Sequence, residues 1–166
     1  MAENYGDGVG VTKEKIESLT SLISFDKNKI IETFEELKDF IGLTSIGNYN
    51  FRSCSSLKKV ILPENVESLG AECFNGCVKL QNINLENIKR VGKECFVNCS
   101  LENTILKLPS ITELTYNCFS NTKIKQVIFG QNITTLYVSP VSTFWNAGPF
   151  YKCCLLYTSD AADDLT

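Results

Sequence analysis

One repeated pattern constrains this chain more than any other feature of its 166 residues. A phenylalanine is followed three residues later by a cysteine at Phe51/Cys54, Phe74/Cys77, Phe96/Cys99 and Phe150/Cys153. Phe119 belongs to the same series, with Thr122 in the cysteine position. From Phe51 to Phe119 the successive spacings are 23, 22 and 23 residues. A fixed period of this length indicates a repeat architecture.

Other positions keep the same phase as these phenylalanines. An aliphatic residue lies five positions before the anchor, at Ile46, Leu69, Val91 and Leu114. Glycine follows it three times, at Gly47, Gly70 and Gly92, where we expect it to permit an unusual backbone angle. After the anchor comes a short alternating apolar run, over 57–62, 80–85 and 124–129, which predicts a strand.

Each unit is too short to bury its own apolar face. Stacked units bury it against one another, which places every repeated position in a column of one continuous core. The short strands then line up as a parallel sheet. The stretch that carries the glycine and the phenylalanine is expected to be a return segment, with the phenylalanine ring filling the layer from the side.

The repeated residues resemble a known family. The segment 57–77 (LKKVILPENVESLGAECFNGC) resembles the leucine-rich repeat of the BspA type, and 34–51 (FEELKDFIGLTSIGNYNF) resembles the unit that opens such arrays. The resemblance implies an α/β leucine-rich-repeat solenoid of mainly short parallel β-strands. It also implies a binding function, often adhesion to host proteins or cells. The departures are Thr122, a longer strand entry at 101–108 and a long connection at 137–149.

The two ends differ from the repeats. Thr12 and Thr33 are candidate N-caps for two helices with inward residues such as Ile16, Leu19 and Leu37, which predicts a helical N-terminal cap over 12–41. Residues 1–11 are expected to be a flexible terminus and 42–153 the BspA-like repeats.

Residues 154–166 lack Lys, Asn and Ile and resemble a translated sequencing adapter. We therefore interpret 154–166 as a non-native tail on a fragment of a longer array.

Composition narrows the classes of function. The chain carries a net charge of −3, which argues against binding nucleic acid. It has no histidine, so the commonest general base and the commonest metal ligand are both missing. Its apolar runs are too short for a membrane span, and it has no glycine-rich phosphate loop. These features favour a non-enzymatic protein that binds no cofactor or metal.

Eight cysteines invite a metal or a disulfide interpretation. Their spacing follows the period of the repeat, however, and predicts two columns: Cys54, Cys77 and Cys99 in one, and Cys73, Cys95 and Cys118 in the other. Buried thiols pack well as small apolar groups. We therefore interpret them as structural free thiols, with disulfides and a metal site as the alternatives.

The outward side of the strands holds the candidate binding residues. If the aliphatic positions of each strand point inward, their neighbours point outward. One outward column is Lys59, Asn82, Ile105 and Gln126, and the other is Ile61, Asn84, Lys107 and Ile128. This mixture of amides, lysines and aliphatic side chains suits a protein or glycan ligand better than a phosphate backbone. The competing interpretation is an ordinary solvated strand face.

The sequence thus predicts a non-enzymatic module that binds a protein or a glycan. The resemblance implies that the ligand is an extracellular component of a host and that the module is part of a cell-surface adhesin. The alternative is a structural spacer, or a targeting arm attached to a missing domain. The resemblance implies a secreted or surface location. No signal peptide follows Met1, which leaves a cytoplasmic location open.

Overall fold

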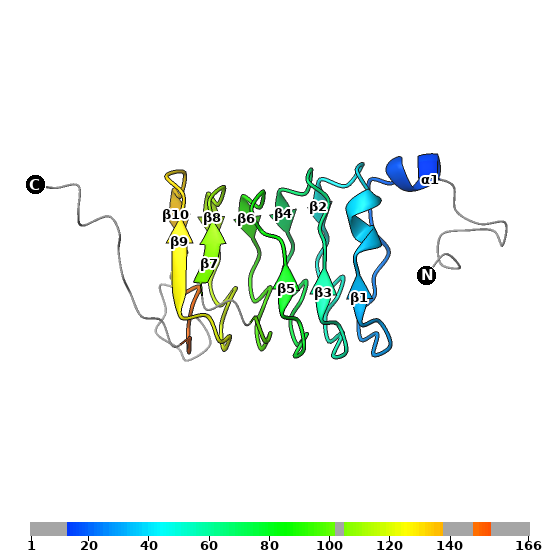
Figure 1. Ribbon diagram of the computed structural model, residues 1–166. Helices are drawn as coiled ribbons and strands as arrows, with labels where there is room; N and C mark the ends of the chain where they lie inside the picture. Colours follow the sequence, from blue (N-terminus) through cyan, green and yellow to red (C-terminus); the bar gives the residue numbers. More distant parts are fainter. Residues whose placement is uncertain (1–12, 102–104, 138–147, 154–166) are drawn as a thin grey trace, which may run out of the picture.

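The computed structural model describes residues 13–101, 105–137 and 148–153. The chain winds into a solenoid whose successive coils lie side by side along one axis (Figure 1). The strands are short, in the order β1 Thr33–Phe34, β2 Ser45–Ile46, β3 Lys59–Val60, β4 Ser68–Leu69, β5 Asn82–Ile83, β6 Arg90–Val91, β7 Ile105–Leu108, β8 Glu113–Leu114, β9 Gln126–Phe129 and β10 Thr135–Leu136. Their inward side chains form the continuous core that the repeat predicts, with Leu62, Leu85 and Leu108 each no more than 3% exposed.

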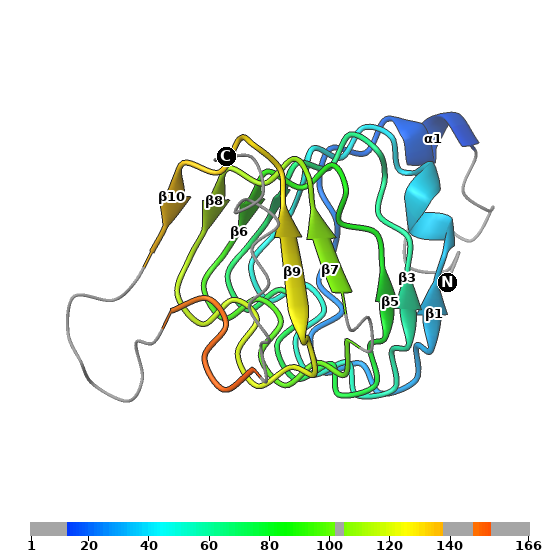
Figure 2. The ribbon, with the colours of Figure 1, turned by 60° about the vertical axis from the view of Figure 1, so that its left-hand side comes forward.

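All the strand pairs are parallel and lie on two sides of the solenoid. One side carries β1, β3 and β5, followed by the separate pair β7–β9 (Figure 2). The other side carries β2, β4, β6, β8 and β10 in one sheet. The expected return segment therefore contains a second sheet, formed by the aliphatic position five residues before each phenylalanine. In this sheet Ile46 pairs with Leu69, Leu69 with Val91, and Val91 with Leu114.

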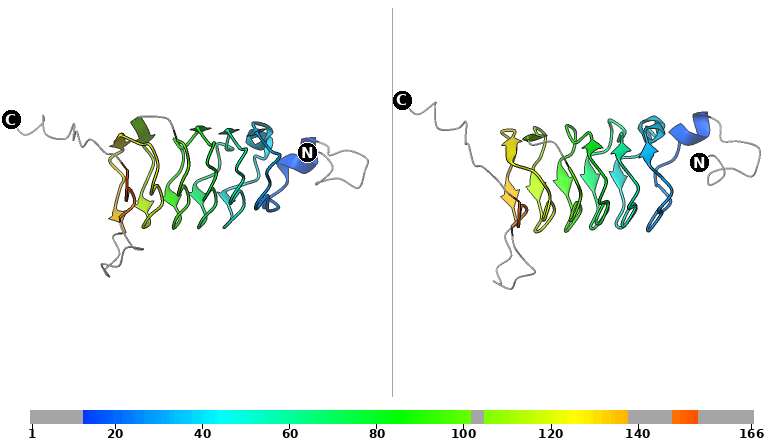
Figure 3. Two further views of the ribbon diagram at one scale, coloured as in Figure 1. Left: turned by 90° about the horizontal axis from the view of Figure 1, so that it is seen from below. Right: turned by 60° about the horizontal axis from the view of Figure 1, so that its bottom comes forward.

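A column of phenylalanine rings runs along the core. Neighbouring rings are parallel within 5°, with centroids 5.0–5.4 Å apart, in the order Phe25, Phe51, Phe74, Phe96, Phe119 and Phe150. This spacing approaches that of neighbouring strands, about 4.8 Å. Each ring therefore marks one coil, and the successive coils are evident in Figure 3.

The predicted helical cap over 12–41 is not supported. Among the described residues of this range, helix is limited to α1 Lys13–Glu17 and one 3-10 turn, Glu36–Asp39. The chain between them forms a further coil instead, because Phe25 stacks on Phe51 and β1 pairs with β3. Asn28 occupies the cysteine position of this coil, and its Oδ1 accepts hydrogen bonds from the amides of Ile30 and Ile31. The predicted flexible terminus 1–11 and the tail 154–166 lie outside the described residues.

The repeated glycines act through close approach and not through an unusual backbone angle. Among the described glycines only Gly76 has a positive φ. A Cβ on Gly92 would lie 2.6 Å from the backbone nitrogen of Ala71, and one on Gly70 would lie 2.6 Å from that of Asn48. Neighbouring coils are therefore too close at this column for any side chain at these two positions.

Left-handed backbone occurs instead at two other columns, two residues before and two residues after the ring. The first column contains Tyr49, Glu72, Glu94 and Asn117. The second contains Lys27, Ser53, Gly76, Asn98, Asn121 and Lys152. Glycine and asparagine adopt this conformation most readily, and other residues adopt it at a cost. The coils of Phe51, Phe74, Phe96 and Phe119 thus turn sharply on both sides of the phenylalanine.

Candidate functional site

Six of the eight predicted outward residues lie on strands, while Ile61 and Asn84 directly follow β3 and β5. Lys59 pairs with Asn82, Ile105 with Gln126, and Lys107 with Ile128. The two columns are not continuous, since β5 and β7 belong to different sheets. The outward residues therefore divide into an N-terminal group on β3–β5 and a C-terminal group on β7–β9.

Side chains of the N-terminal group are engaged in contacts within the solenoid. The Nζ of Lys59 lies 2.9 Å from a carboxylate oxygen of Glu35. The amide of Asn84 accepts a hydrogen bond from the backbone nitrogen of Leu62 at 2.7 Å and donates one to its carbonyl at 3.0 Å. The side-chain amide of Asn84 therefore makes with the backbone of Leu62 the two hydrogen bonds that a neighbouring strand would otherwise make. The sequence pattern predicted Asn84 as an outward binding residue and did not reveal this contact with Leu62.

Ile61 lies beside Asn84 at the rim of a shallow hollow. The hollow has a volume of about 430 Å³ and is also lined by Lys38, Ile41 and Glu64. Ile41 is 50% exposed there. The hollow extends the N-terminal group toward the turn that follows each strand.

The C-terminal group forms a compact patch. Ile105, Lys107, Gln126 and Ile128, here called the β7–β9 patch, lie on two paired strands. Ile105 is 45% exposed and Ile128 is 40% exposed, while the alternate residues Leu106 and Leu108 are buried. The apolar side chains lie diagonally across the pair, because Ile105 is opposite Gln126 and Ile128 is opposite Lys107. This patch combines exposed aliphatic surface with one lysine on a paired backbone.

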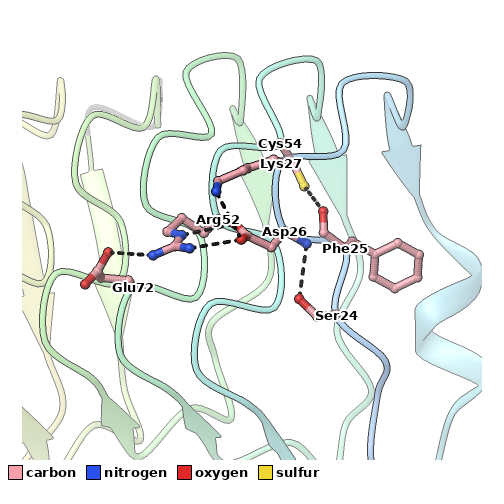
Figure 4. Close-up of polar contacts among 7 residues, drawn as sticks. All are labelled: Ser24, Phe25, Asp26, Lys27, Arg52, Cys54 and Glu72. Carbon is pink, nitrogen blue, oxygen red and sulfur yellow. Dashed lines mark hydrogen bonds and ion pairs between the residues drawn. The ribbon is translucent and has the colours of Figure 1, made fainter.

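A charged network that sequence reasoning missed crosses the edge of the solenoid near the phenylalanine column (Figure 4). The guanidinium of Arg52 donates to both carboxylate oxygens of Asp26, at 3.0 and 2.9 Å, and lies 3.8 Å from a carboxylate oxygen of Glu72. Hydrogen bonding to Arg52 lowers the pKa of Asp26. The only signal in the sequence was position, since Asp26 and Arg52 both directly follow an anchor ring and Glu72 lies two residues before the next one.

The thiols of the first predicted column form a ladder of hydrogen bonds. Cys54 donates to the carbonyl of Phe25, Cys77 to that of Phe51, and Cys99 to that of Phe74, at 2.9–3.1 Å. Each thiol thus links its own coil to the anchor of the coil before it. Within the part of the chain that the structure describes, no group of three His, Cys, Asp or Glu side chains is placed to hold a metal ion.

Burial has the largest effect on three of the core thiols, one in the first column and two in the second. It raises the pKa values of Cys73, Cys99 and Cys118 well above the usual range for cysteine. A protonated thiol is a poor nucleophile and a poor metal ligand. The arrangement therefore supports packing and inter-coil hydrogen bonding.

These features define a parallel β-solenoid of short repeats that presents one strand face and one loop edge. The family model for the BspA type leucine rich repeat region matches residues 19–147 in six copies, and the chain belongs to this family. The match includes the coil of Phe25. No curated protein and no solved structure matches the chain. Among the described residues, no helix has the length and apolar character that crossing a membrane requires.

Proposed function

We propose that this chain is a non-enzymatic module that binds a protein partner through the β7–β9 patch. The observation that carries the proposal is the pair of exposed isoleucines, Ile105 and Ile128, on strands whose other faces are packed in the core. A single exposed aliphatic side chain is ordinary, whereas neighbouring ones on a rigid surface favour a contact. Membership of a leucine-rich-repeat family supports a binding role.

The solenoid would bind with little loss of conformational freedom. Both strands of the patch are held by parallel pairing over Ile105–Leu108 and Gln126–Phe129. A preformed surface loses less entropy on association than a loop that must become ordered. Lys107 favours a partner with acidic residues around an apolar centre. Further repeats add affinity when they engage the same partner.

The alternative function is a structural spacer or a targeting arm attached to another domain. Lys59 and Asn84 favour it for the N-terminal coils, because both side chains make contacts within the solenoid. We propose a cell-surface or secreted location for the module, with an extracellular protein of a host as its partner. If the chain is only a spacer, substitutions in the β7–β9 patch should leave binding unchanged.

The test is direct binding of the purified chain to a panel of immobilised extracellular matrix proteins: fibronectin, laminin and collagen. The double variant I105D/I128D places charge in the centre of the patch. Ile30→Asp is the matched control, since Ile30 is 88% exposed and lies outside the patch. We expect at least one protein to bind the wild type, the double variant to bind it at least about tenfold more weakly, and the control to bind it normally.

Two results would overturn this proposal. In the first, no protein of the panel binds the wild-type chain. In the second, the double variant binds as tightly as the wild type. Circular dichroism of both variants checks that the solenoid is intact.

A further inference from the structure

A hollow opens on the loop edge of the solenoid, away from the β7–β9 patch. It has a volume of about 290 Å³ and is lined by Glu94, Val97, Asn98, Ser120, Asn121 and Tyr151, together with Asn117 and Lys152. Its position follows from side-chain size in the column directly after each anchor ring. Val97 and Ser120 have short side chains, while Arg52 and Tyr151 in the same column have long ones. The hollow therefore forms at the coils of Val97 and Ser120, where the side chains of this column are short.

Two asparagine amides at this hollow offer hydrogen bonds to a ligand. The Nδ2 of Asn121 donates to the Oδ1 of Asn98 at 2.6 Å. This leaves the Nδ2 of Asn98 as a donor and the Oδ1 of Asn121 as an acceptor, and neither atom has a hydrogen-bond partner among the described residues. Both residues are exposed. The pair therefore presents one donor and one acceptor side by side.

The backbone holds these amides in place before any ligand arrives. Asn98 and Asn121 adopt left-handed φ angles of 62° and 55°. Their backbone nitrogens donate to the carbonyls of Ser120 and Tyr151 in the following coil. Polar groups that are fixed in advance bind with a smaller entropic cost.

The remaining walls are an aromatic ring and a carboxylate. Tyr151 is half-buried, and the Nζ of Lys152 lies 5.3 Å from its ring centroid. Aromatic rings combine an apolar body with a polar edge, which suits ligands of mixed polarity. Glu94 contributes a carboxylate, one oxygen of which lies 3.4 Å from the Nζ of Lys93. Because the carboxylate of Glu94 and the ammonium of Lys152 both line the hollow, their charges offset each other, which favours a neutral ligand.

We propose that this hollow binds one neutral sugar ring of a glycan. A pyranose presents adjacent hydroxyl groups that both donate and accept, which matches the Asn98–Asn121 pair, and an apolar face that matches Tyr151. The volume is at the small end of ligand pockets, which limits the occupant to one ring. The proposal rests on the proposed function only in treating the chain as a binding module, since the sugar occupies a different surface from the protein partner.

The test follows amide resonances of the ¹⁵N-labelled chain during titration with four free sugars: glucose, galactose, mannose and N-acetylglucosamine. We expect at least one sugar to shift the resonances of Asn98, Asn121 and Tyr151, with a dissociation constant of about 1 mM or weaker, because the site is shallow. In the variant N98G/N121G we expect that affinity to fall about tenfold, since two hydrogen-bonding side chains are lost.

The variants are chosen so that folding is not the cause of the loss. Glycine retains the left-handed backbone, and Gly76 already occupies the same column. Ser53→Gly is the matched control, because Ser53 lies in this column but not at the hollow, and we expect it to bind the sugar normally. I105D/I128D is also expected to bind the sugar normally, which separates this proposal from the protein-binding one. The proposal is overturned if no sugar shifts these resonances, or if N98G/N121G binds as the wild type does.

Discussion

At the scale of single residues, the cysteines of the first column join neighbouring coils through hydrogen bonds. Each thiol of the ladder donates a second hydrogen bond to a carbonyl of the preceding coil, which already accepts one from a backbone amide of its own coil. A hydrogen bond inside a protein typically contributes about 0.5–1.5 kcal/mol to stability. The column therefore stabilises the stack through hydrogen bonding as well as through packing.

The raised pKa values of Cys73, Cys99 and Cys118 make stability depend on alkaline pH. Above about pH 8.5 the unfolded chain loses these thiol protons, while the folded chain keeps them until its own higher pKa values are reached. Stability is fully present below that pH and falls as pH rises, by about 1.4 kcal/mol per pH unit for each such thiol. Urea unfolding under reducing conditions at about pH 8 and about pH 9.5 measures this slope.

Cys118→Ala is the control for this pH prediction. Its slope against pH should be shallower by the contribution of one thiol, whatever its stability at neutral pH. A wild-type unfolding free energy that stays constant across this range contradicts the assigned thiol environment.

The left-handed backbone of Ser53 is conformationally strained, and a substitution can relieve that strain. We expect Ser53→Gly to raise the free energy of unfolding by about 1 kcal/mol, because glycine adopts a φ of 58° without the Cβ penalty. The nearby Ser56, which has no positive φ, is the control, and Ser56→Gly should lower stability. Thermal unfolding of both variants measures the difference, and a destabilised Ser53→Gly variant contradicts the turn geometry.

The columns of single residues could be predicted from the sequence, since period alone determines which positions align. The phenylalanine rings, the first cysteine column and the inward aliphatic residues are all where the repeat predicts them. The repeat period does not reveal which outward side chains form contacts with the neighbouring coil. The bonds of Asn84 to Leu62 and of Lys59 to Glu35 depend on the distance between coils.

At the scale of elements, the close approach of neighbouring coils depends on glycine in the second sheet. We expect Gly92→Ala to destabilise the protein by about 2 kcal/mol, because its Cβ would meet backbone atoms of Gly70 and Ala71 that have no room to move. Gly148→Ala is the control, as a Cβ there meets nothing within 4 Å. Chemical unfolding of the two variants should show a large loss for the first and a small change for the second. Equal losses contradict this role for the glycine column.

The first coil shows why an element can escape sequence analysis. Phe25 lies 26 residues before Phe51, has Asn28 in place of the cysteine, and lacks the aliphatic residue five positions earlier, where Thr20 stands. Apolar residues at helical spacing in the same stretch favoured a cap of helices. Stacking on Phe51 and pairing of β1 with β3 favour a coil instead, because tertiary packing outweighs weak local helix preference.

At the scale of the whole molecule, the two proposed binding surfaces differ in character and in place. The β7–β9 patch combines two exposed isoleucines with a lysine and a glutamine on a strand face, whereas the hollow at Asn98 and Asn121 is mainly polar and lies on the loop edge. Because each coil contacts only its neighbours, substitutions at one surface should leave the other unchanged. The sequence predicted the first surface through alternation along the strands. It did not predict the second, which depends on side-chain sizes in successive turns.

Hydrogen–deuterium exchange tests the central claim most directly, that this repeat solenoid is a binding module which acts through β7 and β9. The wild-type chain is measured alone and with each of fibronectin, laminin and collagen. The account predicts that at least one of them slows exchange in peptides covering 105–108 and 126–129, while peptides covering β2 and β4 on the opposite side exchange as before. Unchanged exchange with every protein, or protection confined to the β2–β4 side, would contradict it.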